Sequence, residues 1–218
     1  HHHVTLPSCI GRVCPAPCEK VCRRRFVDDA PVSIREIKRF VGDWGINSGR
    51  MGFVPEIEEN GKRVAIVGGG PAGVSAAYYL RLKGYRPVIL EKERLLGGMM
   101  RYGIPDYRLP QEVLDQEIAR IAALGVRILT NAPVADLDAL RQEYDAVHLA
   151  VGAHSAPGLR VPGEDLDGVR SAIDFLRAVN SGERPDVGRR VVVVGGGNTA
   201  IDAARCALRL GAEVTIAY

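Results

Sequence analysis

From Lys62 onward, short apolar runs alternate with longer segments whose apolar residues recur every three or four positions. Apolar runs bounded by glycine or polar residues predict buried strands, and the longer periodic segments predict amphipathic helices. The pattern predicts strands at about 63–67, 87–91, 126–130 and 145–150, and helices at about 72–83, 110–124 and 136–143. After Arg189 a second cycle is predicted, with a strand at 190–194, a helix at 198–210 and a strand at 213–217. This alternation predicts an α/β fold with a parallel sheet covered on both faces.

The first 60 residues differ from this pattern, and four of the five cysteines of the chain lie within them, between positions 9 and 22. Ser33 followed by Glu36 is a capping-box signature, and Ile34, Ile37, Phe40 and Val41 follow with helical spacing. We expect a short amphipathic helix here that ends near Gly42, and then a turn-rich linker over 45–61. The N-terminal segment is therefore predicted to be a small, mainly helical module.

The chain contains an internal repeat. An offset of 127 residues aligns the apolar run at 62–67 with the run at 189–194, and both runs continue into three glycines. The distance from the first of these glycines to the last residue of the next strand is also conserved, from Gly68 to Glu91 and from Gly195 to Tyr218. Two such units in register indicate two related strand–turn–helix–strand structures.

The first copy carries G-x-G-x-x-G between a predicted strand and a predicted helix, which is typical of dinucleotide binding. Gly68 suits the tight turn, Gly70 lets backbone amides approach a pyrophosphate, and Gly73 lets the helix pack on the strand. The helix N-terminus favours an anion. Glu91, at the end of the next strand, is a candidate acceptor for ribose hydroxyls. The alternative is a glycine-rich turn followed by a chance acid.

The second copy has Gly195, Gly197 and Ala200 at the fingerprint positions, and Ala is tolerated at the third. Asn198 and Thr199 lie at the predicted helix start. Tyr218 stands where the first copy has Glu91. Because a carboxylate there would repel a 2′-phosphate, its loss favours NADP(H) over NAD(H) in this unit.

The cysteine cluster consists of Cys9, Cys14, Cys18 and Cys22, with Pro15 directly after Cys14. Four closely spaced cysteines in an intracellular chain indicate a metal or cluster site. All-thiolate ligation with a Cys-Pro step favours a 4Fe–4S cluster, and structural zinc is the alternative. Lys20 and the arginines at 23–25 next to the cluster either dock an acidic electron-transfer partner or simply face solvent. Cys206, far downstream, is expected to be a buried small apolar residue.

Composition narrows the possible partners. The 29 basic and 26 acidic residues leave a net charge of +3, which gives no basis for a nucleic-acid or membrane partner. Without a long apolar window or a signal-peptide pattern, we expect a soluble, cytoplasmic protein. His1, His2 and His3 are interpreted as the end of a purification tag.

Four segments then resemble one known family. These are Gly11–Cys22, Val32–Phe40, Gly97–Pro110, and the strand end Ala150–Ala153. They are similar to the small subunit of NADPH-dependent glutamate synthase and its relatives, which include the N-terminal half of dihydropyrimidine dehydrogenase and ferredoxin:NADP oxidoreductase subunits. The likeness extends over nearly the whole chain from about Leu6.

The resemblance implies two Rossmann-like units, with an NADPH domain inserted into a FAD domain whose closing strands lie beyond Tyr218, so that the FAD domain is C-terminally truncated here. The FAD contacts implied by position, together with the strand-end glycine, are Gly70, Pro71, Ala72, Gly73, Glu91, Gly98, Arg108, Val134 and Gly152. The implied NADPH contacts are Gly197, Asn198, Thr199 and Ala200.

The resemblance also favours the 4Fe–4S cluster, but the sequence departs from the family at one position. The family's first cysteine in this region stands four residues before the next, where this chain has Ile10, while Cys9 stands five before Cys14. The family further carries an upstream cysteine set for a second cluster, and none precedes Val4 in this sequence.

These inferences divide the chain into a cysteine-cluster module (4–60), the first part of a FAD domain (61–155), a connection (156–188) and the start of an NAD(P)H domain (189–218). The expected function is hydride transfer from NADPH to FAD, followed by electron transfer through iron–sulfur clusters to a larger catalytic subunit or a ferredoxin-like acceptor. No side-chain acid or nucleophile is required, so no catalytic residue is assigned. The alternatives are a ferredoxin:NAD(P) oxidoreductase-type input subunit and a non-catalytic assembly or electron-relay module.

Overall fold

The computed structural model describes residues 4–49 and 56–218. The three N-terminal histidines and part of the predicted linker lie outside the described residues. In chain order the elements are α1 (Pro7–Val13), α2 (Pro17–Lys20), α3 (Arg25–Asp28), α4 (Ile34–Asn47), β1 (Arg63–Val67), α5 (Pro71–Leu82), β2 (Arg86–Leu90), α6 (Met99–Tyr102), α7 (Gln111–Ala122), β3 (Arg127–Leu129), α8 (Leu137–Glu143), β4 (Ala146–Leu149), α9 (Ala172–Asn180), β5 (Arg190–Val194), α10 (Asn198–Arg209) and β6 (Glu213–Ala217).

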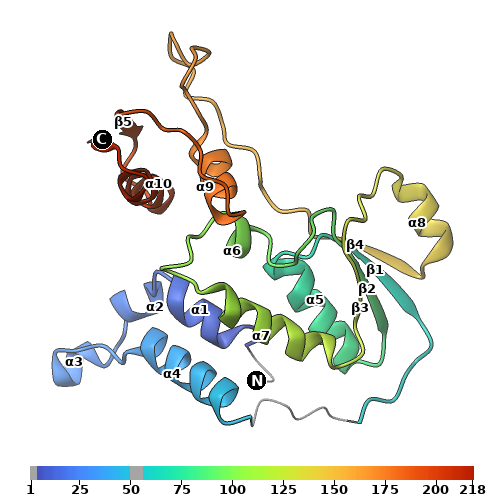
Figure 1. Ribbon diagram of the computed structural model, residues 1–218. Coiled ribbons are helices and arrows are strands. Elements are labelled where there is room, and N and C mark those ends of the chain that lie inside the picture. The colour runs from blue at the N-terminus through green and yellow to red at the C-terminus, as the bar shows by residue number, and fades with distance from the viewer. Residues whose placement is uncertain (1–3, 50–55) are drawn as a thin grey trace.

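A four-stranded parallel sheet, in the order β3-β2-β1-β4, forms the centre of the first unit. Its strands are short apolar runs, as the sequence pattern predicts, and α5 and α7 lie along one face (Figure 1). On that face, Ile66 and Ile89 pack against side chains of α5 and α7. On the opposite face, Ala65 and Val88 pack against Leu140 of α8 and Tyr144 at the end of α8. The parallel sheet is therefore confirmed, with cover on both faces.

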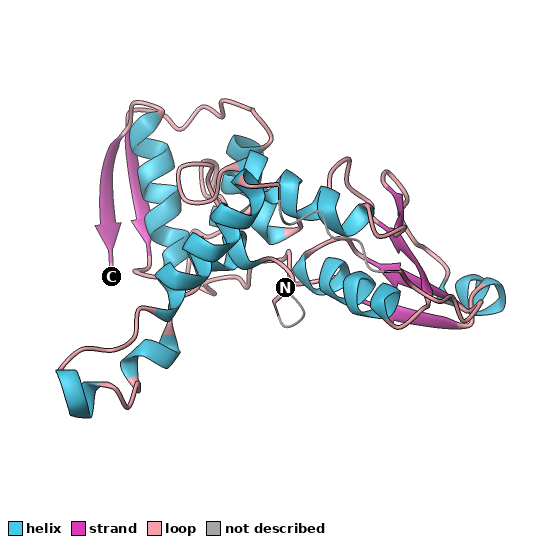
Figure 2. Cartoon of the chain, turned by 90° about the horizontal axis from the view of Figure 1, so that it is seen from below, coloured by secondary structure: helices cyan, strands magenta, loops and turns pink. Residues whose placement is uncertain are grey.

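The second unit is a two-stranded parallel sheet, β5-β6, packed on α10 and α9. Phe175 and Leu176 of α9 meet Ala203 and Cys206 of α10 in a separate small core. Cys206 is 4% exposed, so the expectation of a buried apolar role is confirmed. Figure 2 shows the two sheets at opposite ends of the molecule with helices between them.

The helix of the N-terminal module is longer than predicted. α4 runs to Asn47 and passes through Gly42, where a Cβ would lie 2.6 Å from the backbone nitrogen of Ser8 in α1. Gly42 therefore permits a close crossing of two helices and does not end one. The capping box is also wrong in detail. Ser33 is the N-cap, but its side chain accepts no hydrogen bond from the helix, and the Arg35 N–H donates to the Glu19 carboxylate at 2.8 Å instead.

In the described part of the chain after the N-terminal module, two helices were not predicted. α6 is a single turn, and α9 lies within the segment expected to be only a connection. None of the helices in the described parts of the chain is long and apolar enough to cross a membrane.

Candidate functional site

The turn that follows β1 is built around its glycines. Gly68 has φ of +105°, and its N–H donates to the Leu90 carbonyl at 2.8 Å, so the chain turns sharply while it stays joined to β2. A Cβ on Gly73 would lie 1.9 Å from the Gly68 carbonyl oxygen. Only glycine fits at this contact between helix and turn, as the fingerprint predicts.

The N-terminus of α5 opens into this turn. Gly70 is the N-cap without a side-chain cap, and Pro71 follows at the first helical position. The early N–H groups of a helix have no partner within the helix, and they favour an anion in front of them. A Cβ on Gly70 would meet only the Gly98 Cα, at 3.7 Å, so the backbone leaves room at this point. The arrangement fits a pyrophosphate.

Glu91 lies at the edge of the same turn and is 6% exposed. Its Oε2 accepts the Gly69 N–H at 2.6 Å, and its Oε1 accepts the Glu93 N–H at 2.9 Å. Two backbone donors thus fix the carboxylate in place. Because a carboxylate has about four acceptor sites, it can still accept from ribose hydroxyls.

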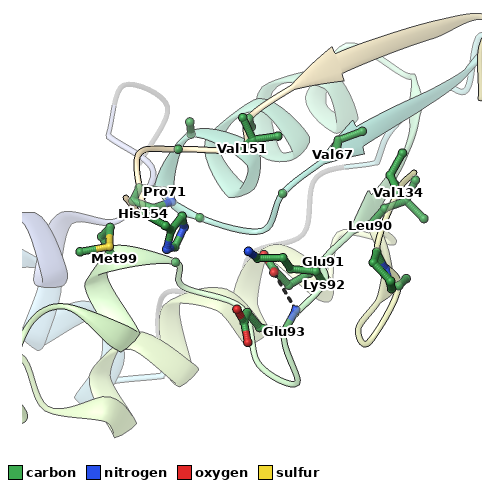
Figure 3. Close-up of a pocket in the computed structure, with 18 residues that line it drawn as sticks. Val67, Pro71, Leu90, Glu91, Lys92, Glu93, Met99, Val134, Val151 and His154 are labelled. Atoms are coloured by element: carbon green, nitrogen blue, oxygen red, sulfur yellow. Dashed lines mark hydrogen bonds between the residues drawn. The ribbon is translucent and has the colours of Figure 1, made fainter. Parts of the chain in front are cut away.

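A pocket of about 520 Å³ opens over this turn and reaches the carboxyl ends of β1, β2 and β4 (Figure 3). A nucleotide site is expected at this edge of a parallel sheet. Its walls are mostly apolar, with charge from Glu91, Lys92 and Glu93 on one side. The sequence-predicted residues that line it are Gly68, Gly70, Pro71, Ala72, Glu91, Gly98, Val134 and Gly152. These residues fit the phosphate and ribose parts of FAD.

Arg108 lies elsewhere. Its guanidinium forms an ion pair with Asp202 of α10, whose side chain is 4% exposed, and Tyr107 donates to the same carboxylate at 3.3 Å. Burial and the Asp202 charge raise the pKa of Tyr107 to about 12. Arg108 is not part of the pocket wall in this structure, and its contact with FAD stays a prediction.

The second glycine turn reproduces the first in geometry. β1 and β2 pair Arg63 with Arg86, and β5 and β6 pair Arg190 with Glu213, at the same offset of 127 residues. The equivalent turn bonds are both 2.8 Å, from the N–H of Gly68 to Leu90 and from that of Gly195 to Ala217. The sequence repeat is thus also a structural repeat.

The residues that follow the second strand of each unit, Glu91 after β2 and Tyr218 after β6, also occupy equivalent positions. Glu91 lies against Gly69, and the Tyr218 ring lies against Gly196, where a Cβ would be 2.6 Å from the ring. Gly197 is the N-cap of α10, and nothing lies within 4 Å of a Cβ placed there. The open helix start carries the expected Asn198, Thr199 and Ala200.

Cys9 does not lie with the other cysteines. It is fully buried in the core beside Leu6 and Leu114, and the Glu117 carboxylate of α7 accepts its N–H at 3.0 Å. Burial and the adjacent Glu117 carboxylate raise the pKa of the Cys9 thiol. Cys9 is therefore a core residue in this structure, and its role as a ligand stays a prediction.

Cys14, Cys18 and Cys22 are more accessible than Cys9. They lie on the segment 14–28, here called the cysteine arm, which carries α2 and α3. Hydrogen bonds from the backbone N–H groups of Val32 and Arg24 lower the pKa of Cys22, which favours a thiolate. However, no three cysteine, histidine or acidic side chains within 4–49 and 56–218 converge closely enough to hold a metal ion. The thiols suit an iron–sulfur centre chemically, but their placement here does not form a complete ligand set.

A family model described as pyridine nucleotide-disulphide oxidoreductase matches residues 62–218. The chain belongs to this family. Two glycine turns of equivalent geometry agree with a family that pairs a flavin with a pyridine nucleotide. A second model, described as dihydropyrimidine dehydrogenase domain II, 4Fe-4S cluster, matches residues 1–50 and supports a 4Fe–4S cluster in the N-terminal module.

Relatives of this oxidoreductase family confirm the resemblance found in the sequence. The chain is 46% identical to the NADPH-Fe(3+) oxidoreductase subunit beta of Geobacter sulfurreducens, over 97% of this chain and 32% of that protein. It is 36% identical to the glutamate synthase [NADPH] small chain of Escherichia coli, over all of this chain and 50% of that protein. The chain thus spans half or less of the length of these relatives.

Solved structures of other proteins share the fold of this chain. FprA from Mycobacterium tuberculosis, in a mutant form, superposes with a TM-score of 0.58 and 33% identity, over 66% of this chain and 36% of that chain. A 2-naphthoyl-CoA reductase complex gives a TM-score of 0.61 and 26% identity, over 74% of this chain and 24% of that chain.

Sequence reasoning missed several residues at the mouth of the pocket. Lys92, Glu93, Met99 and His154 line it without belonging to the glycine fingerprint. Lys92 and Glu93 directly follow Glu91, so their closeness to this predicted site residue in the sequence was a usable signal. The sequence offered no comparable signal for His154.

Proposed function

We propose that this chain is the electron-input part of a flavoprotein oxidoreductase, in which the first unit binds FAD and the second binds NADPH. The observation that carries the proposal is the geometric repeat: two glycine turns with the same register and the same turn bond, the first of which opens into a formed pocket. The chemistry that bound FAD supplies is acceptance of a hydride from NADPH and release of the two electrons singly to iron–sulfur clusters.

The residues of the first unit bind and orient. The start of α5 presents N–H groups to the pyrophosphate, and Gly70 leaves space for it, while Gly98 packs closely against Gly70. Glu91, held by two backbone amides, accepts from the ribose hydroxyls. The apolar wall, which includes Val67, Leu90 and Val134, keeps water from the remaining ligand surface.

We propose NADP(H) as the nucleotide of the second unit. Tyr218 occupies the position of Glu91, so no carboxylate at this position repels a 2′-phosphate. The Tyr218 ring against Gly196 also offers a flat apolar surface near the adenosine end of the nucleotide.

The proposed partner is a larger catalytic subunit or a ferredoxin-like electron acceptor. Support comes from the names of two relatives, which describe a subunit beta and a small chain. Lys20 and the arginines at 23–25 are exposed beside the cysteine arm, where they suit an acidic partner.

Anaerobic reduction of the flavin tests this proposal. The purified chain, reconstituted with FAD, is mixed with equal concentrations of NADPH or NADH, and bleaching of the visible flavin band is followed in time. We expect bleaching by NADPH to be faster. Faster bleaching by NADH would contradict the nucleotide assignment, and a chain that retains no flavin would contradict the assignment of the first unit.

A further inference from the structure

Arg177, on α9, contacts two residues that line the flavin pocket. Its Nη1 donates to Glu93 Oε1 at 2.7 Å, and its Nη2 lies 2.8 Å from His154 Nδ1. Its guanidinium also lies 5.1 Å from the centre of the Tyr102 ring. An arginine has a rigid fork of donors, so one side chain can fix two acceptors in a defined relative position.

The two acceptors come from opposite sides of the glycine turn. Glu93 follows β2 and His154 follows β4, and these strands flank β1 on either side. Figure 3 shows His154 beside Pro71 and Met99, and Glu93 below Glu91. The Arg177 side chain therefore joins the two loops that form opposite walls of the pocket.

The same helix is joined to the second unit. Phe175 and Leu176 pack into the small core with α10, and Asn180 Nδ2 donates to the Tyr102 carbonyl of α6 at 3.1 Å. One face of α9 thus holds the pyridine-nucleotide unit, while Arg177 and Asn180 hold the flavin unit. The connection between the units is an ordered helix with specific contacts on both sides.

We propose that Arg177 is a positioning residue for the flavin pocket, which fixes the loops carrying Glu93 and His154 and ties the pyridine-nucleotide unit to them. It also neutralises Glu93, which would otherwise stand beside Glu91 at a pocket that receives a pyrophosphate. This inference rests on the proposed binding of FAD in the first unit.

The contact sets a requirement on His154. Nδ1 accepts a hydrogen bond from the guanidinium only when it carries no proton, so the neutral ring must be the tautomer with its proton on Nε2.

The test compares FAD dissociation constants, measured by flavin fluorescence on the 218-residue chain. Arg177→Ala is expected to weaken binding about tenfold, the usual effect of losing a hydrogen bond to a charged group. Arg177→Lys keeps one ion pair but loses the forked donor geometry, so its dissociation constant for FAD is expected to lie between those of wild type and Arg177→Ala. Arg184→Ala, at an exposed arginine of the same connection, is the matched control and should bind like wild type.

The double variant Arg177→Ala/Glu93→Gln separates positioning from simple charge neutralisation. If positioning matters, the double variant still binds FAD more weakly than wild type. Full recovery of affinity would overturn the proposal, and so would an Arg177→Ala chain that binds as tightly as wild type.

Amide hydrogen exchange in the ligand-free chain gives a second readout that does not depend on FAD. Arg177→Ala is expected to speed exchange in the loops at 91–96 and 150–155 and to leave β1 unchanged. Unchanged loop exchange would overturn the positioning role. A wild-type chain that shows this loop protection but binds no FAD would instead contradict the proposed function.

Discussion

The fingerprint glycines of the first turn have different surroundings, and this difference gives separable roles to two of them. Gly73 touches the Gly68 carbonyl so closely that any side chain would collide, whereas Gly70 faces open space near Gly98. We therefore expect Gly73 to be needed for the fold and Gly70 to be needed for ligand binding.

Alanine at each position tests this distinction. Gly73→Ala places a Cβ 1.9 Å from the Gly68 oxygen and is expected to cost about 1–3 kcal/mol or more of folding stability, as overpacking does. Gly70→Ala is expected to fold normally but to bind FAD about tenfold more weakly, since its methyl group occupies the place of the pyrophosphate. Thermal unfolding and flavin titration of both variants provide the measurement, and equal thermal stability of the two would contradict the distinction.

The cysteines also separate at the residue scale. Cys9→Ala is expected to keep the iron content of the reconstituted chain, because Cys9 lies in the core against Glu117, and to cost about 1 kcal/mol of stability. Cys18→Ala, at an exposed position on the arm, is expected to lose most of the iron. Iron bound per chain is the measurement, and loss of iron in the Cys9 variant would contradict this expectation and support Cys9 as a ligand.

Several single-residue roles could be predicted from the sequence, and others could not. The glycines and Glu91 are close together along the chain, so the fingerprint alone located them in one turn. Arg108 contacts Asp202, which lies 94 residues away in the sequence, and Cys9 contacts Glu117, which lies 108 residues away. Spacing within a motif carries no information on such partners.

Strands and helices were predicted best where the apolar pattern was strongest. β5 and β6 match the predicted ranges, and α7 begins and ends within two residues of the predicted helix at 110–124. α4 and α9 were missed in extent or entirely. Gly42 was interpreted as a helix end although it permits close packing, and Ser171, which accepts the Asp174 N–H, was an overlooked N-cap for α9.

One buried carboxylate joins two elements of different modules. Glu117 of α7 is fully buried and accepts the N–H groups of Ser8 and Cys9 at the start of α1. Burial raises the pKa of Glu117 above its ordinary value of 4.5, although the hydrogen bonds from α1 oppose this.

The raised pKa makes stability depend on pH. The contribution of a carboxyl group with a raised folded-state pKa is complete below the unfolded value and is lost as the pH rises through the folded value. We therefore expect the free energy of unfolding to fall as the pH rises above about 4.5. Glu117→Gln should flatten this slope, and Glu112→Gln, on the exposed side of the same helix, should not. Denaturant unfolding across this pH range provides the measurement, and a slope that survives Glu117→Gln contradicts the assignment.

At the scale of the whole molecule, the N-terminal module is followed by two unequal dinucleotide units joined by specific contacts. The first has a formed pocket and the fixed carboxylate of Glu91, while the second has an equivalent turn with Tyr218 in the place of Glu91. α9 and the Arg108–Asp202 pair connect the units, and neither link was predicted from the sequence because each joins segments from different units. The repeat itself was predicted, because each copy is a continuous stretch of sequence that can be aligned with the other.

The central claim is that the pocket behind the first glycine turn binds FAD with Glu91 on the ribose. Titration of FAD into the wild-type chain and into Glu91→Ala tests it directly. The account predicts saturable binding of one FAD per wild-type chain. In the variant it predicts that affinity for FAD falls by about tenfold or more, as expected for a lost hydrogen bond to a charged group. Absence of saturable binding to the wild type, or equal affinity of the two chains, would contradict it.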